Sequence, residues 1–322
     1  MNKNIHNDSL KPKVNKEKII KARESILLKL IFIIIVFYIN NKLDSKFKFE
    51  RLQYSFIDID KYKEIINLEE NGLIEIYKNP NKTSEIETKK GKIYKSEIVF
   101  LIIPGGSYEK LGPPERLPVA KKYFSLGYSS SLLNYSVYPA CYPTEYNQGL
   151  QAIKILSTKF KKIILIGFSA GGHLAGLLGT TERKQLFNAV GMILCYPVIS
   201  FYKKAHEKSR KNFFGDKIIN DEKHRKFFSI QNRVNSKTLP TFIWTIKNDK
   251  VVPYENTLFM IEKLKENNVM FEYKIYKKGR HGMALGDETA IRYGIYEYKN
   301  LKVSKWVNVS CKFVEKLIKN NN

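Results

Sequence analysis

A serine framed by glycines is the clearest chemical signal in the sequence. The stretch 167–171, GFSAG, has the pattern G-x-S-x-G, in which a sharp turn presents a serine hydroxyl as a nucleophile. The apolar, strand-like segment Ile163–Ile166 precedes it, and a run of small, helix-compatible residues follows it. We therefore predict that Ser169 is the nucleophile of an acyl-transfer reaction. A nucleotide-binding loop is the alternative, but the sequence contains neither G-x-G-x-x-G nor G-K-[ST].

A serine nucleophile needs a histidine base and an acid that orients it, in the chain order Ser, acid, His for a serine at such a turn. Of the five histidines, only His281 follows the last predicted strand, in a loop at the carboxyl end of the predicted sheet. Asp249 follows the preceding strand and is the predicted acid. His173 lies just beyond the serine turn and is interpreted as a structural residue that hydrogen-bonds nearby loops.

Backbone N–H groups must also stabilise the oxyanion that forms during acyl transfer. One is expected from Ala170, directly after the nucleophile, and another from the turn 104–108, PGGSY, which follows a predicted strand ending at Ile103. Glycines in such a turn let the backbone approach a substrate closely. Four elements in the expected order predict a serine hydrolase that uses neither a metal nor an organic cofactor.

These residues must be positioned by alternating strands and helices. The predicted strands are Leu73–Tyr77, Ile93–Ile103, Tyr128–Leu133, Ile163–Ile166, Val190–Cys195, Thr241–Ile246 and Phe271–Tyr276. The predicted helices are Glu115–Leu126, Tyr146–Phe160, Gly171–Gly179, Tyr254–Asn267 and Val303–Ile318. This alternation predicts one α/β domain over 51–322, with a mostly parallel sheet covered by helices on both faces.

A basic insertion at about 200–237 interrupts the alternation and is a candidate lid over one end of the sheet. Its nine Lys and Arg residues between Lys203 and Lys226 either attract an acidic substrate or form a solvated face. Three tyrosines are equally compatible with lining the substrate cleft and with packing in the core: Tyr108, Tyr138 and Tyr142.

The chain resembles the α/β-hydrolases, in the branch of small bacterial carboxylesterases that includes acetyl-xylan-esterase-like and feruloyl-esterase-like proteins. The collinear stretches that carry the resemblance are PGGSY (104–108), PVAKKYFSLGY (118–128), NYSVYPACYP (134–143), GFSAGGHLAGLLGT (167–180), LCYPVIS (194–200), NDKVVPYENTLFMIEKLKENNV (248–269) and GRHGM (279–283). The resemblance implies an α/β-hydrolase fold, the catalytic triad Ser169, Asp249 and His281, and oxyanion donors at Gly106, Ser107 and Ala170. Ser107 departs from the family, which usually has a third glycine there.

The first fifty residues differ from the rest of the chain. A basic, polar stretch over 1–24 precedes the apolar segment Ser25–Ile39, whose unbroken apolar run, Leu30–Ile39, is ten residues long. This run is shorter than the roughly 20 residues of a spanning helix. No small-residue cleavage site follows it. We expect an uncleaved membrane anchor at about 25–39 that leaves the catalytic domain outside the cytoplasm. The alternative is an apolar leader or a helix packed on a cytoplasmic protein.

Composition and charge exclude several classes of protein. A hydrophobic content of 43% excludes a mostly disordered chain, and three cysteines exclude a disulfide-dense scaffold. The net charge of +25 comes from 47 Lys and 9 Arg against 31 acidic residues, with Lys spread along the whole chain. Since Arg is the preferred residue for phosphate and base contacts, we expect no nucleic-acid partner.

The sequence therefore predicts a serine esterase that cleaves short-acyl carboxylic esters, and the resemblance suggests acetyl esters of carbohydrates. An amidase or peptidase with the same triad remains open, since the serine turn and the oxyanion donors do not distinguish an ester from an amide. Outside the enzymes, the alternatives are a membrane-anchored binding protein on an inactive hydrolase fold and a basic protein that binds polyanions.

Overall fold

The computed structural model describes residues 57–215, 221–289 and 299–320. These residues belong to one compact unit that spans Tyr54–Asn322. The membrane anchor expected at about 25–39 and the domain boundary expected near residue 50 lie outside the described residues. Within the described ranges, no helix combines the length and the apolar character that crossing a membrane requires.

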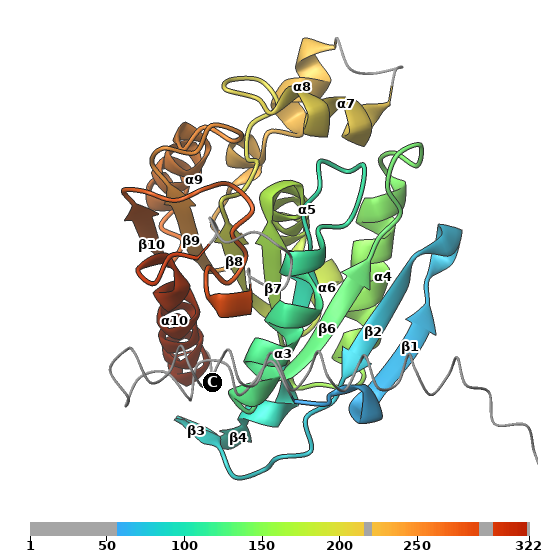
Figure 1. Ribbon diagram of the computed structural model, residues 1–322, viewed down its shortest axis with the longest axis vertical. Helices are drawn as coiled ribbons and strands as arrows, with labels where there is room; N and C mark the ends of the chain where they lie inside the picture. The colour runs from blue at the N-terminus through green and yellow to red at the C-terminus, as the bar shows by residue number, and fades with distance from the viewer. Residues whose placement is uncertain (1–56, 216–220, 290–298, 321–322) are drawn as a thin grey trace, which may run out of the picture. The chain divides into compact units, whose positions relative to one another are not determined.

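An eight-stranded sheet forms the centre of this unit, in the strand order β1-β2-β6-β5-β7-β8-β9-β10 (Figure 1). The strands are β1 (Lys63–Asn67), β2 (Leu73–Tyr77), β5 (Ile98–Ile103), β6 (Ser129–Asn134), β7 (Lys162–Phe168), β8 (Ala189–Cys195), β9 (Thr241–Ile246) and β10 (Phe271–Tyr276). From β6 to β10 all neighbours are parallel, whereas β1 and β2 pair antiparallel. The predicted mostly parallel sheet is therefore confirmed.

The central strands are apolar along their whole length because helices cover both faces of the sheet. All six residues of β5 are buried. Val99, Leu101 and Ile103 contribute to one hydrophobic core, and the alternating residues Phe100 and Ile102 contribute to the other. This alternation follows from the two-residue period of a strand.

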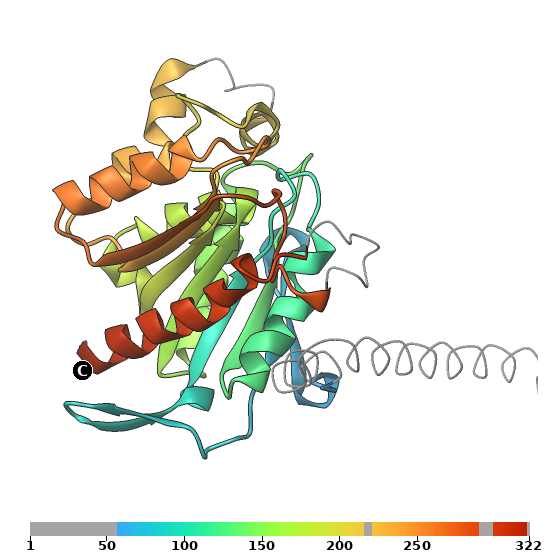
Figure 2. The same ribbon diagram turned by 60° about the vertical axis from the view of Figure 1, so that its left-hand side comes forward.

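Two groups of helices cover the two faces. α4 (Thr144–Ser157), α5 (Ser169–Gly179) and α9 (Glu255–Glu266) pack on one core, and α3 (Leu117–Ser125) and α10 (Trp306–Asn320) on the other. Figure 2 shows β10 lying between α9 and α10. A short helix, α6 (Arg183–Leu186), precedes β8. The helix bounds lie within two residues of most of the predicted ones.

One predicted strand is wrong. Residues 93–103 are divided between β4 (Gly91–Tyr94) and β5 by the 3₁₀ turn η4 (Lys95–Glu97). The Glu97 carboxylate accepts a hydrogen bond of 3.0 Å from the Tyr94 N–H, which ends β4 at this turn. Among the described strands, β4 pairs only with β3 (Glu85–Thr88), in a separate hairpin that was not predicted.

Another predicted boundary is wrong at the start of α3. The helix begins at Leu117, because Arg116 has φ −106° and ψ −110°, outside the helical region. Glu115 belongs instead to the short 3₁₀ turn η5 (Pro113–Glu115), and its side chain is buried. The edge strand β1 was also not predicted, since four of its five residues are exposed and carry no hydrophobic pattern.

The insertion at 200–237 contains two helices and a 3₁₀ turn, α7 (Glu207–Phe214), α8 (Glu222–Phe227) and η6 (Ile230–Arg233). Figures 1 and 2 place α7 and α8 at the end of the sheet where the parallel strands terminate.

Candidate active site

Ser169 occupies a strained turn between β7 and α5. Its φ is +51°, a left-handed conformation that side chains with a Cβ rarely adopt. Glycines make the turn possible: a Cβ on Gly167 would lie 2.6 Å from the Cβ of Ala175, and one on Gly105 would lie 2.8 Å from the Cβ of Ser169. The sequence thus fixes the serine at the carboxyl end of β7, directly against the turn that follows β5.

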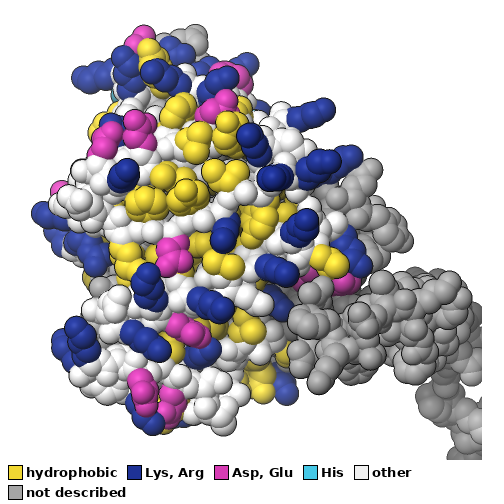
Figure 3. Space-filling model, turned by 90° about the vertical axis from the view of Figure 1, so that its left-hand side faces the viewer, with side chains coloured by type: hydrophobic (Ala, Val, Ile, Leu, Met, Phe, Trp, Pro, Cys, Tyr) yellow, Lys and Arg dark blue, Asp and Glu magenta, His cyan; other side chains and the backbone are white. Residues whose placement is uncertain are grey.

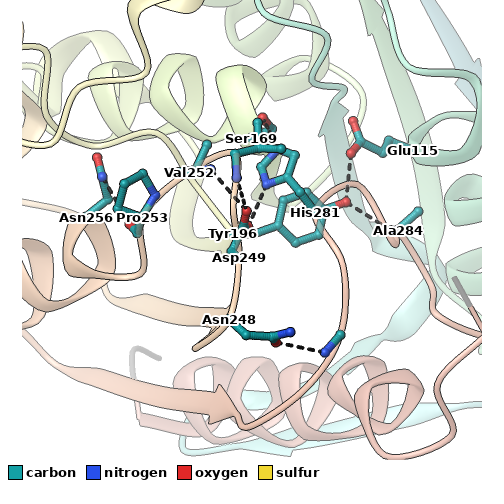
Figure 4. Close-up of polar contacts among 12 residues, drawn as sticks. Glu115, Ser169, Tyr196, Asn248, Asp249, Val252, Pro253, Asn256, His281 and Ala284 are labelled. Atoms are coloured by element: carbon teal, nitrogen blue, oxygen red, sulfur yellow. Dashed lines mark hydrogen bonds and ion pairs between the residues drawn. The ribbon is translucent and has the colours of Figure 1, made fainter. Parts of the chain in front are cut away.

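Three side chains from three loops form a continuous hydrogen-bonded chain (Figure 4). Ser169 Oγ lies 2.7 Å from His281 Nε2, and His281 Nδ1 lies 2.7 Å from Asp249 Oδ2. Each bond has the length of a good hydrogen bond. The structure therefore brings together the three residues that the sequence analysis selected, in the arrangement by which a histidine accepts a serine proton.

Asp249 is held in place by its own loop. Its side chain has no exposed surface, and its Oδ1 accepts hydrogen bonds from the backbone N–H groups of Val251, at 2.8 Å, and Val252, at 3.1 Å. Its other oxygen is thereby directed at His281, whose side chain is 14% exposed. The carboxylate can fix the imidazole tautomer and stabilise an imidazolium.

The turn after β5 provides backbone donors beside the serine. Gly106 and Ser107 have φ values of +127° and +61°, and no described hydrogen bond uses the N–H group of either residue. Ala170 lies in the first turn of α5, where N–H groups have no partner within the helix. The N–H of Gly105 is engaged, since it donates to Glu115 Oε2 at 2.7 Å.

The buried His173 contacts Tyr108, the last residue of the turn 104–108. Tyr108 is 1% exposed, and its hydroxyl lies 2.9 Å from His173 Nδ1. His173 Nε2 lies 2.8 Å from the carbonyl oxygen of Phe228 in the insertion. Burial lowers the pKa of His173 to about 3, so the ring stays neutral. The structural role predicted for His173 is confirmed, and Tyr108 is a core residue rather than a cleft residue.

The other two tyrosines that were considered for the cleft differ from each other. Tyr142 packs against Phe213 and Phe228 of the insertion, with ring centroids 5.3 and 4.6 Å away, so it forms an aromatic cluster with these two residues. Tyr138 is 45% exposed. Neither lines the described cavity next to His281.

The insertion makes direct contact with the turn after β5, residues 104–108, which the sequence analysis predicts to hold oxyanion donors (hereafter the oxyanion turn). Asn212 of α7 donates a hydrogen bond of 2.8 Å from Nδ2 to the carbonyl oxygen of Ser107. Lys208 forms an ion pair of 2.7 Å with Glu109, directly beyond the turn. The sequence analysis missed Asn212, because an asparagine in a basic insertion carries no signal of its partner.

A cavity of about 410 Å³ opens beside His281. Its lining comes from the loops after β9 and β10 and includes Asn248, Lys250 and Arg280. His206, at the amino end of α7, is a further polar group near the triad: burial first and then the charge of His281 lower its pKa.

Comparison with known proteins gives a consistent result. Residues 150–298 match the prolyl oligopeptidase family, and this range contains all three residues of the hydrogen-bonded chain. The crystal structure of an acetyl ester-xyloside bifunctional hydrolase from Caldicellulosiruptor lactoaceticus superposes with a TM-score of 0.63 at 28% identity, over 83% of this chain and 93% of that one. The chain has the α/β-hydrolase fold.

Two curated relatives match part of this α/β-hydrolase. An acetylxylan esterase from Xylanibacter ruminicola is 28% identical over 196 residues, which cover 57% of this chain and 40% of that protein. Endo-1,4-beta-xylanase B from Butyrivibrio fibrisolvens is 27% identical over 210 residues, covering 59% of this chain and 33% of that protein. The chain thus spans about two fifths and one third of the length of these relatives.

The surface of the α/β-hydrolase shows how its charge is distributed. Figure 3 shows Lys and Arg side chains spread over the visible face, interspersed with acidic and hydrophobic side chains, rather than gathered in one basic patch. On this face, the basic residues are dispersed in space as the lysines are along the sequence.

Proposed function

We propose that this α/β-hydrolase is a serine esterase that cleaves short-acyl carboxylic esters, with acetyl esters of carbohydrates as its substrate class. The observation that carries the proposal is the unbroken chain from Asp249 through His281 to a left-handed Ser169. The acetylxylan esterase and the acetyl ester-xyloside hydrolase among the relatives support the choice of ester and of carbohydrate.

The first half of the reaction forms an acyl-enzyme. Ser169 Oγ attacks the ester carbonyl while His281 Nε2 takes the hydroxyl proton, and the Asp249 carboxylate stabilises the resulting imidazolium. The N–H groups of Ala170 and of the Gly106–Ser107 turn donate to the oxyanion. The bond to the alkoxy oxygen then breaks, and His281 gives its proton to the departing alcohol.

Water completes the cycle. His281, now neutral, accepts a proton from a water molecule that attacks the acyl-enzyme, and it returns this proton to Ser169 Oγ as the carboxylic acid leaves. Every step uses the same three side chains and the same backbone donors, so the acyl group and the alcohol can vary while the mechanism is conserved.

Replacing the nucleophile tests the proposal. Ser169→Ala is expected to lower kcat on a short p-nitrophenyl ester by at least about a thousandfold, because no acyl-enzyme can form. Ser125→Ala, which removes an exposed serine hydroxyl at the end of α3, is the matched control and should retain full activity. Full activity of Ser169→Ala would contradict the proposed mechanism.

A peptidase or amidase activity is the second candidate, and the match to the prolyl oligopeptidase family favours it. The same triad and oxyanion donors can act on an amide. Matched p-nitrophenyl esters and p-nitroanilides with the same acyl group separate the two activities. For an esterase, the ratio of the ester rate to the anilide rate is much larger than the ratio of the two uncatalysed hydrolysis rates.

We also propose that the N-terminal segment anchors the enzyme to a membrane with the catalytic domain on the extracytoplasmic side. The support comes from the sequence: the apolar run Leu30–Ile39 follows a stretch rich in lysine, and basic flanks remain preferentially on the cytoplasmic side.

A further inference from the structure

We propose that Glu115 and Tyr196 form a positioning pair that joins the oxyanion turn to the loop of His281, and that the Glu115 carboxylate places a second negative charge near the imidazole. The inference rests on the proposed serine-hydrolase function. Neither residue belongs to the triad or to the oxyanion donors; Tyr196 lies in the stretch LCYPVIS (194–200) that carries the resemblance, but the sequence analysis assigned no role to either residue.

The Glu115 carboxylate bridges two parts of the site through its two oxygens. Oε2 accepts a hydrogen bond of 2.7 Å from the N–H of Gly105, the residue before the oxyanion donors Gly106 and Ser107. Oε1 accepts a hydrogen bond of 2.7 Å from the hydroxyl of Tyr196, at the end of β8. The carboxylate therefore fixes the first glycine of the turn by a bond that a substrate cannot compete for.

Tyr196 continues the connection to the histidine. Its hydroxyl oxygen accepts a hydrogen bond of 3.0 Å from the N–H of Ala284, three residues after His281 (Figure 4). Its ring packs edge to face against the imidazole, with ring centroids 5.0 Å apart. Tyr196 has φ +37°, a strained conformation, so the surrounding structure must hold this ring in place.

Charge and burial give Glu115 more than a packing role. The residue is 5% exposed, and within the described residues it forms no ion pair with Lys or Arg. Burial raises the pKa of Glu115, and the hydrogen bonds from Tyr196 and Gly105, together with the charge of His281, act in the opposite direction. The imidazolium that forms during catalysis is thus a positive partner for this buried carboxylate.

Four other ionisable residues near His281 come from two loops and from the insertion. Asp249 contacts the ring from the loop after β9, His206 approaches it from the insertion, and Lys250 and Arg280 line the cavity beside it. Burial and the charge of His281 lower the pKa of His206, the one histidine among these groups, so His206→Gln is needed to assign any change in a pH profile.

Two substitutions test the geometric part of the proposal. Glu115→Gln leaves only one accepting oxygen for the two donors, Gly105 N–H and Tyr196 O–H, because an amide nitrogen does not accept hydrogen bonds. Tyr196→Phe removes only a hydroxyl. Each is expected to lower kcat on the p-nitrophenyl ester about tenfold, with KM changed less than about twofold, because neither residue touches substrate. Since both act through one connection, the double variant should be no slower than the slower single variant.

The pH profile tests the electrostatic part, which a merely structural role would leave unchanged. Removing a negative charge near an imidazolium makes the imidazolium release its proton at lower pH. The acidic limb of the kcat/KM profile should therefore shift to lower pH in Glu115→Gln, in the wild-type and in the His206→Gln background. It should stay in place in Tyr196→Phe. Glu145→Gln, a buried glutamate without contact to the His281 loop, is the matched control.

The rate at which a fluorophosphonate labels Ser169 separates this proposal from the proposed function. If the wild type labels but hydrolyses no ester, the esterase proposal fails, and labelling that is about tenfold slower in both variants still supports the positioning pair. Additive losses with an unmoved acidic limb would overturn the proposal, as would full activity of Tyr196→Phe. Should Glu115→Gln not fold, the kcat of Tyr196→Phe decides. A wild type that neither labels nor hydrolyses overturns both proposals.

Discussion

At the scale of single residues, the site depends on buried groups whose protonation is set by their surroundings. His173 has a partner on each ring nitrogen and is neutral, so it can join Tyr108 to Phe228 without introducing a charge. Glu145, in the first turn of α4, is the opposite case. It is 1% exposed, and neither of its carboxyl oxygens has a hydrogen-bond partner among the described residues.

Glu145 makes stability depend on pH. Burial raises the pKa of Glu145 from 4.5 to about 8. Since the folded pKa lies above the unfolded one, the neutral form contributes stability that is complete below about pH 4.5 and is lost as the pH rises toward 8. Glu145→Gln removes this loss. We expect the free energy of unfolding of the variant, relative to the wild type, to be on the order of 3 to 4 kcal/mol more favourable at pH 8 than at pH 5.

Urea denaturation at the two pH values measures this difference. Glu262→Gln, an exposed position on α9, is the control and should show the same small effect at both values. An equal effect of Glu145→Gln at pH 5 and pH 8 would show that the carboxyl group does not titrate in this range in the folded protein.

At the scale of elements, the insertion holds the oxyanion turn in place through hydrogen bonds. Three of its groups form hydrogen bonds with residues outside the insertion. The Asn212 side chain donates to the carbonyl oxygen of Ser107. The carbonyl oxygen of Phe213 accepts a hydrogen bond of 2.8 Å from the N–H of Tyr142, and the carbonyl oxygen of Phe228 contacts His173. Opening this insertion as a lid would require breaking bonds that hold the catalytic turn, so we expect its core to stay closed during turnover.

The bond from Asn212 tests this role. Ser107 has a positive φ, a conformation that costs a serine more free energy than a glycine. We therefore expect its carbonyl to need a fixed hydrogen-bond partner to keep the turn in one conformation. Asn212→Ala is expected to lower kcat about five- to tenfold through a less well-placed oxyanion donor, consistent with the loss of roughly 1 kcal/mol. Steady-state kinetics on the p-nitrophenyl ester check this result.

Asn232→Ala is the matched control for Asn212→Ala. Asn232 Nδ2 makes a bond of the same kind and length, 2.8 Å to the carbonyl of Lys226, but both residues lie within the insertion. This variant should retain the wild-type kcat. Equal losses in the two variants would mean that the insertion influences activity through its own stability rather than through the oxyanion turn.

At the scale of the whole molecule, the order of elements could be predicted because strand residues carry strong local patterns. The buried, largely apolar strands β5, β7 and β9 define the sheet, and the residues directly after them include the glycine turn, Ser169 and Asp249, respectively. Glu115 and Tyr196 could not be found in this way. A glutamate at a helix start is ordinarily interpreted as a first-turn acid, and only the packed structure shows that its side chain points inward.

The break in the strand predicted over 93–103 has a similar cause. The residues favour a strand throughout, but Glu97 reaches back to the N–H of Tyr94, and this side-chain bond competes with strand pairing. Local propensity does not contain that information, because the competing bond depends on how the hairpin β3–β4 leaves the main sheet.

The proposed membrane anchor is also a property of the whole chain. Full-length protein should stay in the membrane fraction after a carbonate wash, and added protease should reach its catalytic domain in spheroplasts. Ile34→Lys, which interrupts the apolar run, should release the protein into the soluble fraction. Retention of this variant, or protection of the catalytic domain from protease, would contradict the proposed topology.

The dispersal of the site over the carboxyl ends of successive strands has a consequence for how the enzyme matures. Gly106 follows β5, Ser169 follows β7, Asp249 follows β9 and His281 follows β10, which among the described strands pairs only with β9. During synthesis on the ribosome, no amino-terminal portion that stops short of β10 can act on substrate, however well folded it is. Recovery of activity after denaturation therefore requires β10 to pair with β9, and formation of the central strands alone does not restore it.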